Sequence, residues 1–207
     1  MELKDYYRLI VRHLPLVLVS TIVGTLIAGL YSFLATPVYQ AKAQLFVSTP
    51  SSALDVSALV QGSSFSQQRV KSYAQIINGP STLEPVIKDL GLNISSEKLA
   101  KQITATAPLD TVLINITVSN ENKYLAARIA NAVGNQFAIT ANSLESTNAI
   151  ESNSIKVTMV KTATVPTSPY SPKKALNLIL GFILGFGLGL GIAILRQIFD
   201  NTIKGAE

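Results

Sequence analysis

Two long apolar runs without a charged residue constrain this 207-residue chain more than any other feature. The first covers residues 16–35 and the second covers residues 175–195. At a rise of about 1.5 Å per residue, about 20 helical residues span the ~30 Å hydrocarbon core of a bilayer. We therefore predict two transmembrane helices that bracket one central domain.

The first run also admits a second interpretation, a cleaved signal peptide. Lys4, Arg8 and Arg12 precede it as a basic segment, and small residues follow it. The apolar core of a signal peptide usually has only ~7 to 15 residues, and this run is longer. Tyr31 and Phe33 near its far end are typical of a helix that meets the membrane interface, so a retained span is the preferred prediction.

Basic residues close to the spans predict the orientation. Lys4, Arg8 and Arg12 lie before the first span, and Arg196 and Lys204 lie after the second. Since Lys and Arg are enriched in short cytoplasmic segments, we predict a plasma-membrane protein with both termini in the cytoplasm. The two lysines just before the second span favour the opposite orientation, but only weakly.

The predicted organisation has six segments. They are a cytoplasmic N-terminal segment (1–15), a first transmembrane helix (16–35), an extracytoplasmic α+β domain (36–165), a proline-rich connector (166–174), a second transmembrane helix (175–195) and a cytoplasmic tail (196–207).

Alternating and helical patterns predict the elements of the central domain. Apolar and polar residues alternate as in a strand over residues 37–48, 102–108, 111–119 and 154–166. Helical spacing is present over residues 67–78, over a second short segment that Ser81 and Glu84 would cap and Gly91 would end, and over a long helix, 121–145, that Asn120 would cap. This order predicts an α+β domain with a small mixed or antiparallel sheet, in which the first and last strands pair.

The stretch "VPTSPYSPKK" places prolines at a spacing of three before the second span. Pro166, Pro169 and Pro172 favour a semi-rigid extended segment, with Ser171 as N-cap and Pro172 as the first helical residue. This connector either keeps the domain away from the lipid or couples the domain to the second helix.

Small residues recur at a spacing of four in both spans, which lets helix backbones approach closely. Such rows could pack the two helices of one subunit or join subunits. The predicted packing residues are Ser20, Gly24 and Ala28 in the first span, Gly181, Gly185 and Gly189 in the second, and a further row of Gly187 and Gly191.

Little in the chain suggests an enzyme. His13 is the only histidine and cysteine is absent, which excludes an outward-facing Ser-His or Cys-His site and leaves only carboxylates as metal ligands. We therefore predict no catalytic residue, metal or cofactor. A paired-carboxylate glycosidase stays open because such pairs form only in the fold; the acids in question are Asp55, Glu84, Asp89, Glu97, Asp110, Glu121, Glu145 and Glu151.

The net charge of +5 does not indicate a nucleic-acid partner, because the loop has no run of basic residues. Attraction to anionic lipid near the spans explains the surplus at least as well. Arg69, Lys71 and Arg128 are candidates for contact with an anionic glycan, and an ordinary solvated surface is the alternative for each.

Several stretches resemble the Wzz-type chain-length determinants, also called polysaccharide co-polymerases. They are "MELKDYYRLIVRH", "TPVYQAKAQLFVS", "QQRVKSYAQII", "APLDTVLINITV", "VPTSPYSPKK" and "LRQIFDNTIK", and the likeness is greatest to the small Gram-positive and actinobacterial branch. The resemblance implies a homo-oligomeric membrane scaffold that regulates the length and export of capsular or exopolysaccharide. It also implies partnership with the polymerase and export machinery and with a cytoplasmic tyrosine kinase. From the residues alone, a membrane-anchored receptor or adhesion module for cell-wall glycan is the alternative.

Overall fold

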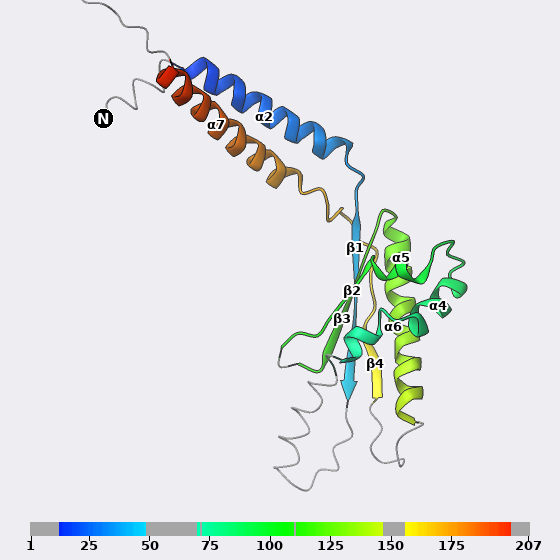
Figure 1. The fold of residues 1–207 in the computed structure, drawn as a ribbon. Helices are drawn as coiled ribbons and strands as arrows, with labels where there is room; N and C mark the ends of the chain where they lie inside the picture. Colours follow the sequence, from blue (N-terminus) through cyan, green and yellow to red (C-terminus); the bar gives the residue numbers. More distant parts are fainter. Residues whose placement is uncertain (1–12, 49–69, 71, 110, 147–155, 200–207) are drawn as a thin grey trace, which may run out of the picture. The chain divides into compact units, whose positions relative to one another are not determined.

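The computed structural model describes residues 13–48, 70, 72–109, 111–146 and 156–199 (Figure 1). The chain forms two units. One contains the residues up to Pro37 and from Ser171 onward, and the other is Val38–Tyr170. The first holds two apolar helices and the second is an α+β domain, which confirms the predicted fold class.

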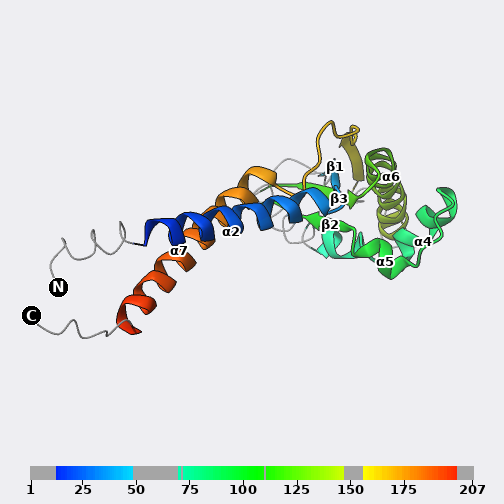
Figure 2. The ribbon, with the colours of Figure 1, turned by 90° about the horizontal axis from the view of Figure 1, so that it is seen from above.

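The helical unit consists of α2 (Leu14–Leu34) and α7 (Lys174–Phe199). Both are long and apolar enough to cross a bilayer. Figures 1 and 2 show them side by side. Pro15 lies in the first turn of α2, where the missing N–H has no helical partner in any case.

A four-stranded antiparallel sheet forms one layer of the α+β domain. Its strands are β1 (Tyr39–Ser48), β2 (Ile103–Thr106), β3 (Leu113–Asn120) and β4 (Lys156–Lys161), in the spatial order β2-β3-β1-β4. β1 pairs with both β3 and β4. The predicted pairing of the first and last strands is therefore confirmed, and the sheet is antiparallel rather than mixed.

One face of the sheet carries the core. Side chains of β1 and β3 alternate between this face and the other, and those on the core face are almost fully buried: Ala41, Ala43, Leu45, Val47, Ile114, Ile116 and Val118. The long helix α6 (Lys123–Ser146) packs on this face through Ile129, Val133 and Phe137 (Figure 1). The Tyr73 ring meets Phe137 edge-on, with ring centroids 6.1 Å apart. The alternating pattern of the strands and the helical pattern of residues 121–145 thus predicted side chains that pack against each other in one core.

Two short helices, α4 (Pro80–Asp89) and α5 (Ser96–Ala100), together with helical residues at 70 and 72–76, belong to the same helical layer. The prediction of a Ser81–Glu84 cap is wrong, because the helix begins two residues earlier, with Gly79 as N-cap and Pro80 as the first helical residue. Gly91 ends α4 as predicted. It has φ +61°, and the N–H groups of Gly91 and Leu92 donate to the carbonyls of Lys88 and Ile87, at 3.3 and 2.9 Å.

The start of α6 differs from the prediction by two residues. The Oδ1 atom of Asn122 accepts from the N–H groups of Tyr124 and Leu125, so Asn122 is the capping residue. Asn120, the last residue of β3, instead donates its side-chain amide to Gln102, the residue before β2, and its Oδ1 atom accepts from Asn122 N–H. Both asparagines are suitable capping residues. Because β3 extends to Asn120, the helix can begin only after it, and Asn122 becomes the cap.

The outer edge of β4 is covered by asparagines of α6. The N–H of Val157 donates to Asn142 Oδ1 at 3.0 Å. Just beyond the strand, Asn131 both accepts from Ala163 N–H (2.7 Å) and donates to its carbonyl (3.0 Å). An edge strand with unpaired backbone groups invites pairing with another chain, and these side chains occupy the groups instead. They also fix α6 to the segment that leads toward the second membrane helix.

We expect Asn131→Ala to lower the stability of the domain by about 1–3 kcal/mol, because the Ala163 backbone is buried and loses both partners. Thermal unfolding of the detergent-purified protein, followed by circular dichroism, measures the change. Asn135→Ala is the matched control because Asn135 lies exposed on the same helix. Equal melting temperatures for the two variants would show that the two hydrogen bonds between Asn131 and Ala163 do not stabilise the fold.

Candidate functional site

The contact between α2 and α7 gathers most of the small residues that the sequence singled out. Gly181, Gly185 and Gly189 are the buried glycines of α7, and Ala193 extends their row by one turn. They face the row of Ser20, Gly24 and Ala28 on α2. The structure therefore uses these rows to pack the two helices of one chain, one of the two alternatives that the sequence left open.

The backbones approach so closely that only glycine fits. A Cβ atom added at Gly185 would lie 2.7 Å from the carbonyl oxygen of Ser20 and 2.9 Å from Thr21 Cα. One added at Gly24 would lie 2.8 Å from the Gly181 carbonyl oxygen. These neighbours are backbone atoms, which cannot move aside as a flexible side chain can. Because lipid tails are as apolar as the side chains, such close van der Waals packing is what holds membrane helices together.

Polar groups inside this contact are paired. The hydroxyls of Ser20, Thr21 and Thr25 donate to carbonyls one turn earlier in α2, at 2.9, 2.7 and 2.8 Å. Asn177 Nδ2 of α7 reaches Ser32 Oγ of α2 at 3.5 Å, a long contact between the two helices. Thr21 and Ser32 were not among the predicted packing residues. Ser32 continues the row of Ser20, Gly24 and Ala28 by four residues, and Thr21 lies three residues before Gly24, on the same helical face.

Two ring and charge contacts lie outside the glycine rows. Lys174 Nζ lies 5.1 Å from the centroid of the Phe33 ring, so it joins the start of α7 to the end of α2. Phe182 and Phe186 of α7 stack with centroids 6.3 Å apart and are exposed on its surface. Gly187 and Gly191 also face away from α2, since no atom lies within 4 Å of a Cβ built at either. Within the described residues, this second row therefore takes no part in packing against another element.

The connector differs from the predicted straight segment. The chain bends at Thr167, Ser168 and Tyr170, and the bond between Ser171 and Pro172 is cis. Tyr170 N–H donates to the carbonyl of Val38 at 2.8 Å. Because the connector is still held beside the start of β1 there, Ser171 is not an N-cap and Pro172 is not the first helical residue. The helix begins at Lys174, and the Lys173 carbonyl accepts its first hydrogen bond, from Asn177 N–H at 3.0 Å.

The other predicted site residues do not converge. Arg69 and Lys71 lie outside the described residues, and Arg128 is exposed on α6. His13 lies at the start of α2. Of the acids that could have formed a carboxylate pair, Glu84 and Asp89 lie on or at the end of α4, Glu97 on α5 and Glu121 before α6; Asp55, Asp110 and Glu151 lie outside the described residues, as does the side chain of Glu145. Within the described part of the chain, no group of three His, Cys, Asp or Glu residues could hold a metal ion.

Two family models match the chain, one over its N-terminal part and one over its C-terminal part. The model described as "Chain length determinant protein" (Wzz) matches residues 1–90, which include α2, β1 and α4. The model described as "G-rich domain on putative tyrosine kinase" (GNVR) matches residues 125–198, which include most of α6, β4, the connector and nearly all of α7. The matched range contains the glycine rows of α7 described above.

Relatives match over 93–100% of this chain. The "Probable capsular polysaccharide biosynthesis protein YwqC" of Bacillus subtilis is 30% identical over 100% of this chain and 81% of its own length. The chain belongs to the Wzz chain length determinant family. Two other proteins similar to this chain are the "Capsular polysaccharide biosynthesis protein CpsC" of Streptococcus pneumoniae (28% identity, 93% of this chain, 81% of CpsC) and the "Capsular polysaccharide biosynthesis protein CapA" of Staphylococcus aureus (27%, 100% of this chain, 90% of CapA).

A solved structure confirms the Wzz fold independently of close sequence similarity. The "full-length bacterial polysaccharide co-polymerase" superposes with a TM-score of 0.54 at 12% identity and covers 99% of this chain and 100% of that one. The resemblance predicted from the sequence motifs is confirmed. Two apolar helices in a member of this family make the chain a membrane protein.

We expect Gly185→Leu to destabilise the helix pair by about 1–3 kcal/mol, because a larger side chain forces the α2 and α7 backbones apart. Gly187→Leu is the matched control, since its Cβ would meet open space and leucine is the better helix former. Thermal unfolding of both variants in the same detergent checks the difference. A Gly187→Leu variant that melts as early as Gly185→Leu would contradict the assigned packing face.

Proposed function

We propose that this protein is a non-catalytic membrane scaffold that regulates the chain length and export of a capsular or exopolysaccharide. The observation that carries the proposal is the whole-length relationship to YwqC, whose name concerns capsular polysaccharide biosynthesis. The fold supports it with a domain whose two chain ends, at Val38 and Tyr170, are hydrogen-bonded to each other and lead into the two membrane helices. The described acids lie scattered over several elements, as expected for a scaffold rather than a hydrolase.

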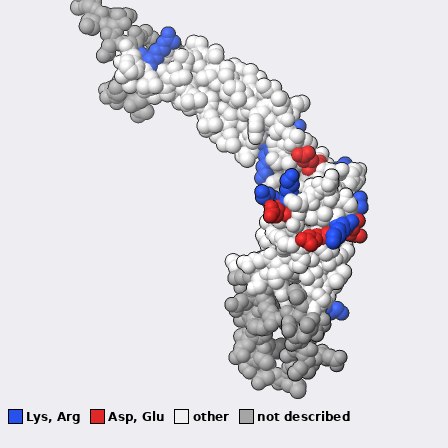
Figure 3. Space-filling view, turned by 45° about the vertical axis from the view of Figure 1, so that its right-hand side comes forward, with Lys and Arg blue, Asp and Glu red and all other residues white. Residues whose placement is uncertain are grey.

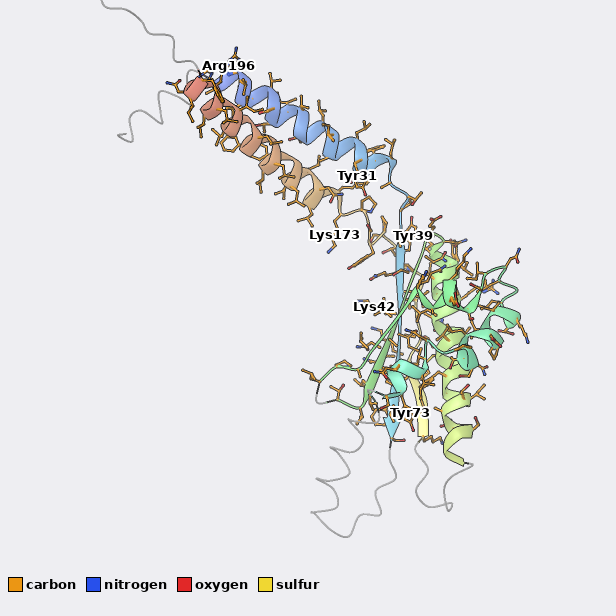
Figure 4. The ribbon with its side chains drawn as sticks, in the orientation of Figure 1. Tyr31, Tyr39, Lys42, Tyr73, Lys173 and Arg196 are labelled. Carbon is orange, nitrogen blue, oxygen red and sulfur yellow. The ribbon has the colours of Figure 1, made fainter. Side chains whose placement is uncertain are left out.

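The proposed topology keeps the predicted segments. Residues 1–15 and 196–207 are cytoplasmic, the helices over 16–35 and 175–195 span the plasma membrane, and residues 36–165 form an extracytoplasmic domain followed by the connector at 166–174. Lys4, Arg8 and Arg12 before α2 and Arg196 in the last turn of α7 support this orientation. Figure 4 shows Arg196 at the end of α7 far from the connector, and Figure 3 shows a charge-free surface along the helices between their ends.

Two partners complete the proposal. The first is a second copy of the chain. The row of Gly187 and Gly191 supports a contact with it, because these glycines face away from α2 and meet no other element that the structure describes. The second is a cytoplasmic tyrosine kinase, which the description of the GNVR model supports. The connector around Pro166, Pro169 and Pro172 then couples the outer domain to α7 and its tail.

Deletion of the gene in its own host should shift the length distribution or the yield of the surface polysaccharide, which gel filtration of the purified polymer measures. Complementation with the parent chain should restore the distribution. Complementation with Gly185→Leu should restore it only in part, because the helix pair is weakened, whereas Gly187→Leu tests the proposed subunit contact separately. Polymer of unchanged length and yield after deletion would count heavily against the proposal.

The topology is open to a clean test because the native chain has no cysteine. Single cysteines at Leu3, Thr106 and Ala206 place one thiol in each terminal segment and one in the exposed part of β2. A membrane-impermeant maleimide applied to intact cells should label only Thr106→Cys, and all three variants should react after the cells are lysed. Labelling of either terminal cysteine in intact cells would contradict the orientation.

A further inference from the structure

The sheet of the α+β domain has a second face, which no described helix covers. Figures 1 and 2 show α6, α4 and α5 all on one side of the strands, and Figure 4 shows Lys42 extending from β1 on the other side. We call this side the open face. Its side chains are those that alternate with the buried ones: Gln40, Lys42, Gln44, Phe46 and Ser48 of β1; Leu113, Asn115, Thr117 and Ser119 of β3; Thr104 and Thr106 of β2; and Lys156, Thr158 and Lys161 of β4.

The open face carries three lysines, Lys42, Lys156 and Lys161, and a β-bulge in β4 places Lys161 there. The register of β4 against β1 shifts between Gln44 and Leu45, so that Leu45 opposes Met159 and Gln44 opposes Lys161. The residue between them, Val160, is the extra one. Without the shift, the alternation along β4 would turn Lys161 toward the core. The irregularity therefore places a positive charge beside Gln44 on the side away from α6.

Two of the lysines are diagonal neighbours. Lys42 lies two residues before Gln44 on the same strand, and Lys161 lies directly opposite Gln44 on the next strand. Such diagonal positions have Cα atoms about 7–8 Å apart. Lys42 and Lys161 are exposed, and neither takes part in an ion pair within the described residues. Two like charges this close repel each other, and an anion placed between them would relieve the repulsion.

The open face carries no acid among the described residues, whereas the helical layer mixes both signs. Acids and bases alternate along that layer, and Figure 3 shows red and blue side chains next to one another on the domain. The residues concerned are Glu84, Lys88 and Asp89 at α4, Glu97, Lys98 and Lys101 at α5, and Glu121 and Lys123 at the start of α6. Among the described residues, positive charge without a nearby acid is thus specific to the open face.

The same face presents an ordered row of hydrogen-bonding groups. Gln44 Nε2 donates to Asn115 Oδ1 at 2.8 Å, and Gln40 Nε2 donates to Ser119 Oγ at 3.1 Å. Each of these pairs bridges β1 and β3 and fixes the direction of its amide. An amide has two donors and an acceptor with two lone pairs, so each pair retains unused groups that point to solvent. Thr117, which opposes Lys42 on β3, adds a hydroxyl between the two pairs.

We propose that the open face binds an acidic polysaccharide strand. Lys42 and Lys161, with Lys156 further along β4, hold the carboxylate or phosphate groups of the polymer, and the amide and hydroxyl rows hydrogen-bond its sugar hydroxyls. The inference rests on the proposed function, which supplies a surface polysaccharide as the polymer that the domain meets. The site differs from the candidates Arg69, Lys71 and Arg128, which belong to other parts of the chain.

The test uses the full-length protein in detergent and two fluorescently labelled probes of similar size. One probe is a hyaluronan oligosaccharide, which carries a carboxylate on alternate sugars, and the other is neutral dextran. The parent protein should bind hyaluronan, should bind it more weakly as salt is raised from 0.05 to about 0.5 M because the charges are screened, and should bind dextran at least about tenfold more weakly. Equal affinity for the two probes would overturn the proposal.

The decisive variant is the double substitution Lys42→Gln and Lys161→Gln. It should weaken hyaluronan binding about tenfold, because two charge contacts with the carboxylates of the polymer are lost. Lys98→Gln with Lys101→Gln removes the same charge from the helical layer and should change affinity less than about twofold. Lys42→Arg with Lys161→Arg should retain binding, and unchanged circular dichroism shows that each variant is folded. Equal losses in the two Gln double variants would overturn the assignment to the open face.

Two further outcomes separate the site from the function. Vesicles containing 30% phosphatidylserine should bind the parent and the Lys42→Gln/Lys161→Gln protein equally well. The proposal would be overturned if the protein did not bind hyaluronan and if vesicle binding depended on these two lysines. The membrane surface would then be the partner. If gene deletion changes polymer length while the double variant binds hyaluronan normally, the site is wrong and the function stands. If hyaluronan binding behaves as expected while deletion leaves the polymer unchanged, the function is wrong and the site stands.

Discussion

The antiparallel pairing of β1 with β4 is the interaction on which the rest of the structure depends. β1 follows the first membrane helix in the sequence and β4 precedes the second, so their pairing brings the two ends of the α+β domain together. The hydrogen bond from Tyr170 to Val38 continues this pairing to the boundary of the domain. A domain inserted between two membrane helices must return its chain to where it started, and neighbouring antiparallel strands do so without a long crossover connection.

One helix, α6, covers both the core face and the β4 edge of this sheet. α6 buries Ile129, Val133 and Phe137 against the sheet, while its Asn131 and Asn142 occupy the backbone groups at the edge of β4. One side of α6 is apolar, and asparagines lie along the border of that side. The helix therefore both packs on the core and protects the sheet edge. In the membrane unit the driving force is different. Lipid offers no hydrophobic gain for helix association, and the contact depends on backbone proximity at Gly24, Gly181 and Gly185.

The scaffold function that we propose needs a surface for the polymer and a connection to the membrane, and the fold provides them in different units. The open face of the sheet carries positive charge and ordered amides, while the opposite face is used entirely for the core. The membership of the Wzz family gives this division a purpose, because its relatives are named for capsular polysaccharide biosynthesis. The four-stranded sheet then serves on one side for stability and on the other, as we propose, for contact with an acidic glycan.

The sequence by itself determined the two apolar helices, the α+β class, the order of the elements and the family, because these follow from hydrophobic periods and from motifs that are local in the chain. It also determined that Gly91 ends a helix and that the glycines of the second span pack closely. Only the tertiary structure decided which glycines face α2 and which face away, since a spacing of four does not state what lies opposite. Asn122 replaced Asn120 as the cap, and Lys174 replaced Pro172 as the start of α7, because strand contacts hold Asn120 and the end of the connector. The position of Lys161 on the open face depends on a bulge opposite a strand more than a hundred residues away, and no local pattern in the chain encodes such a partner.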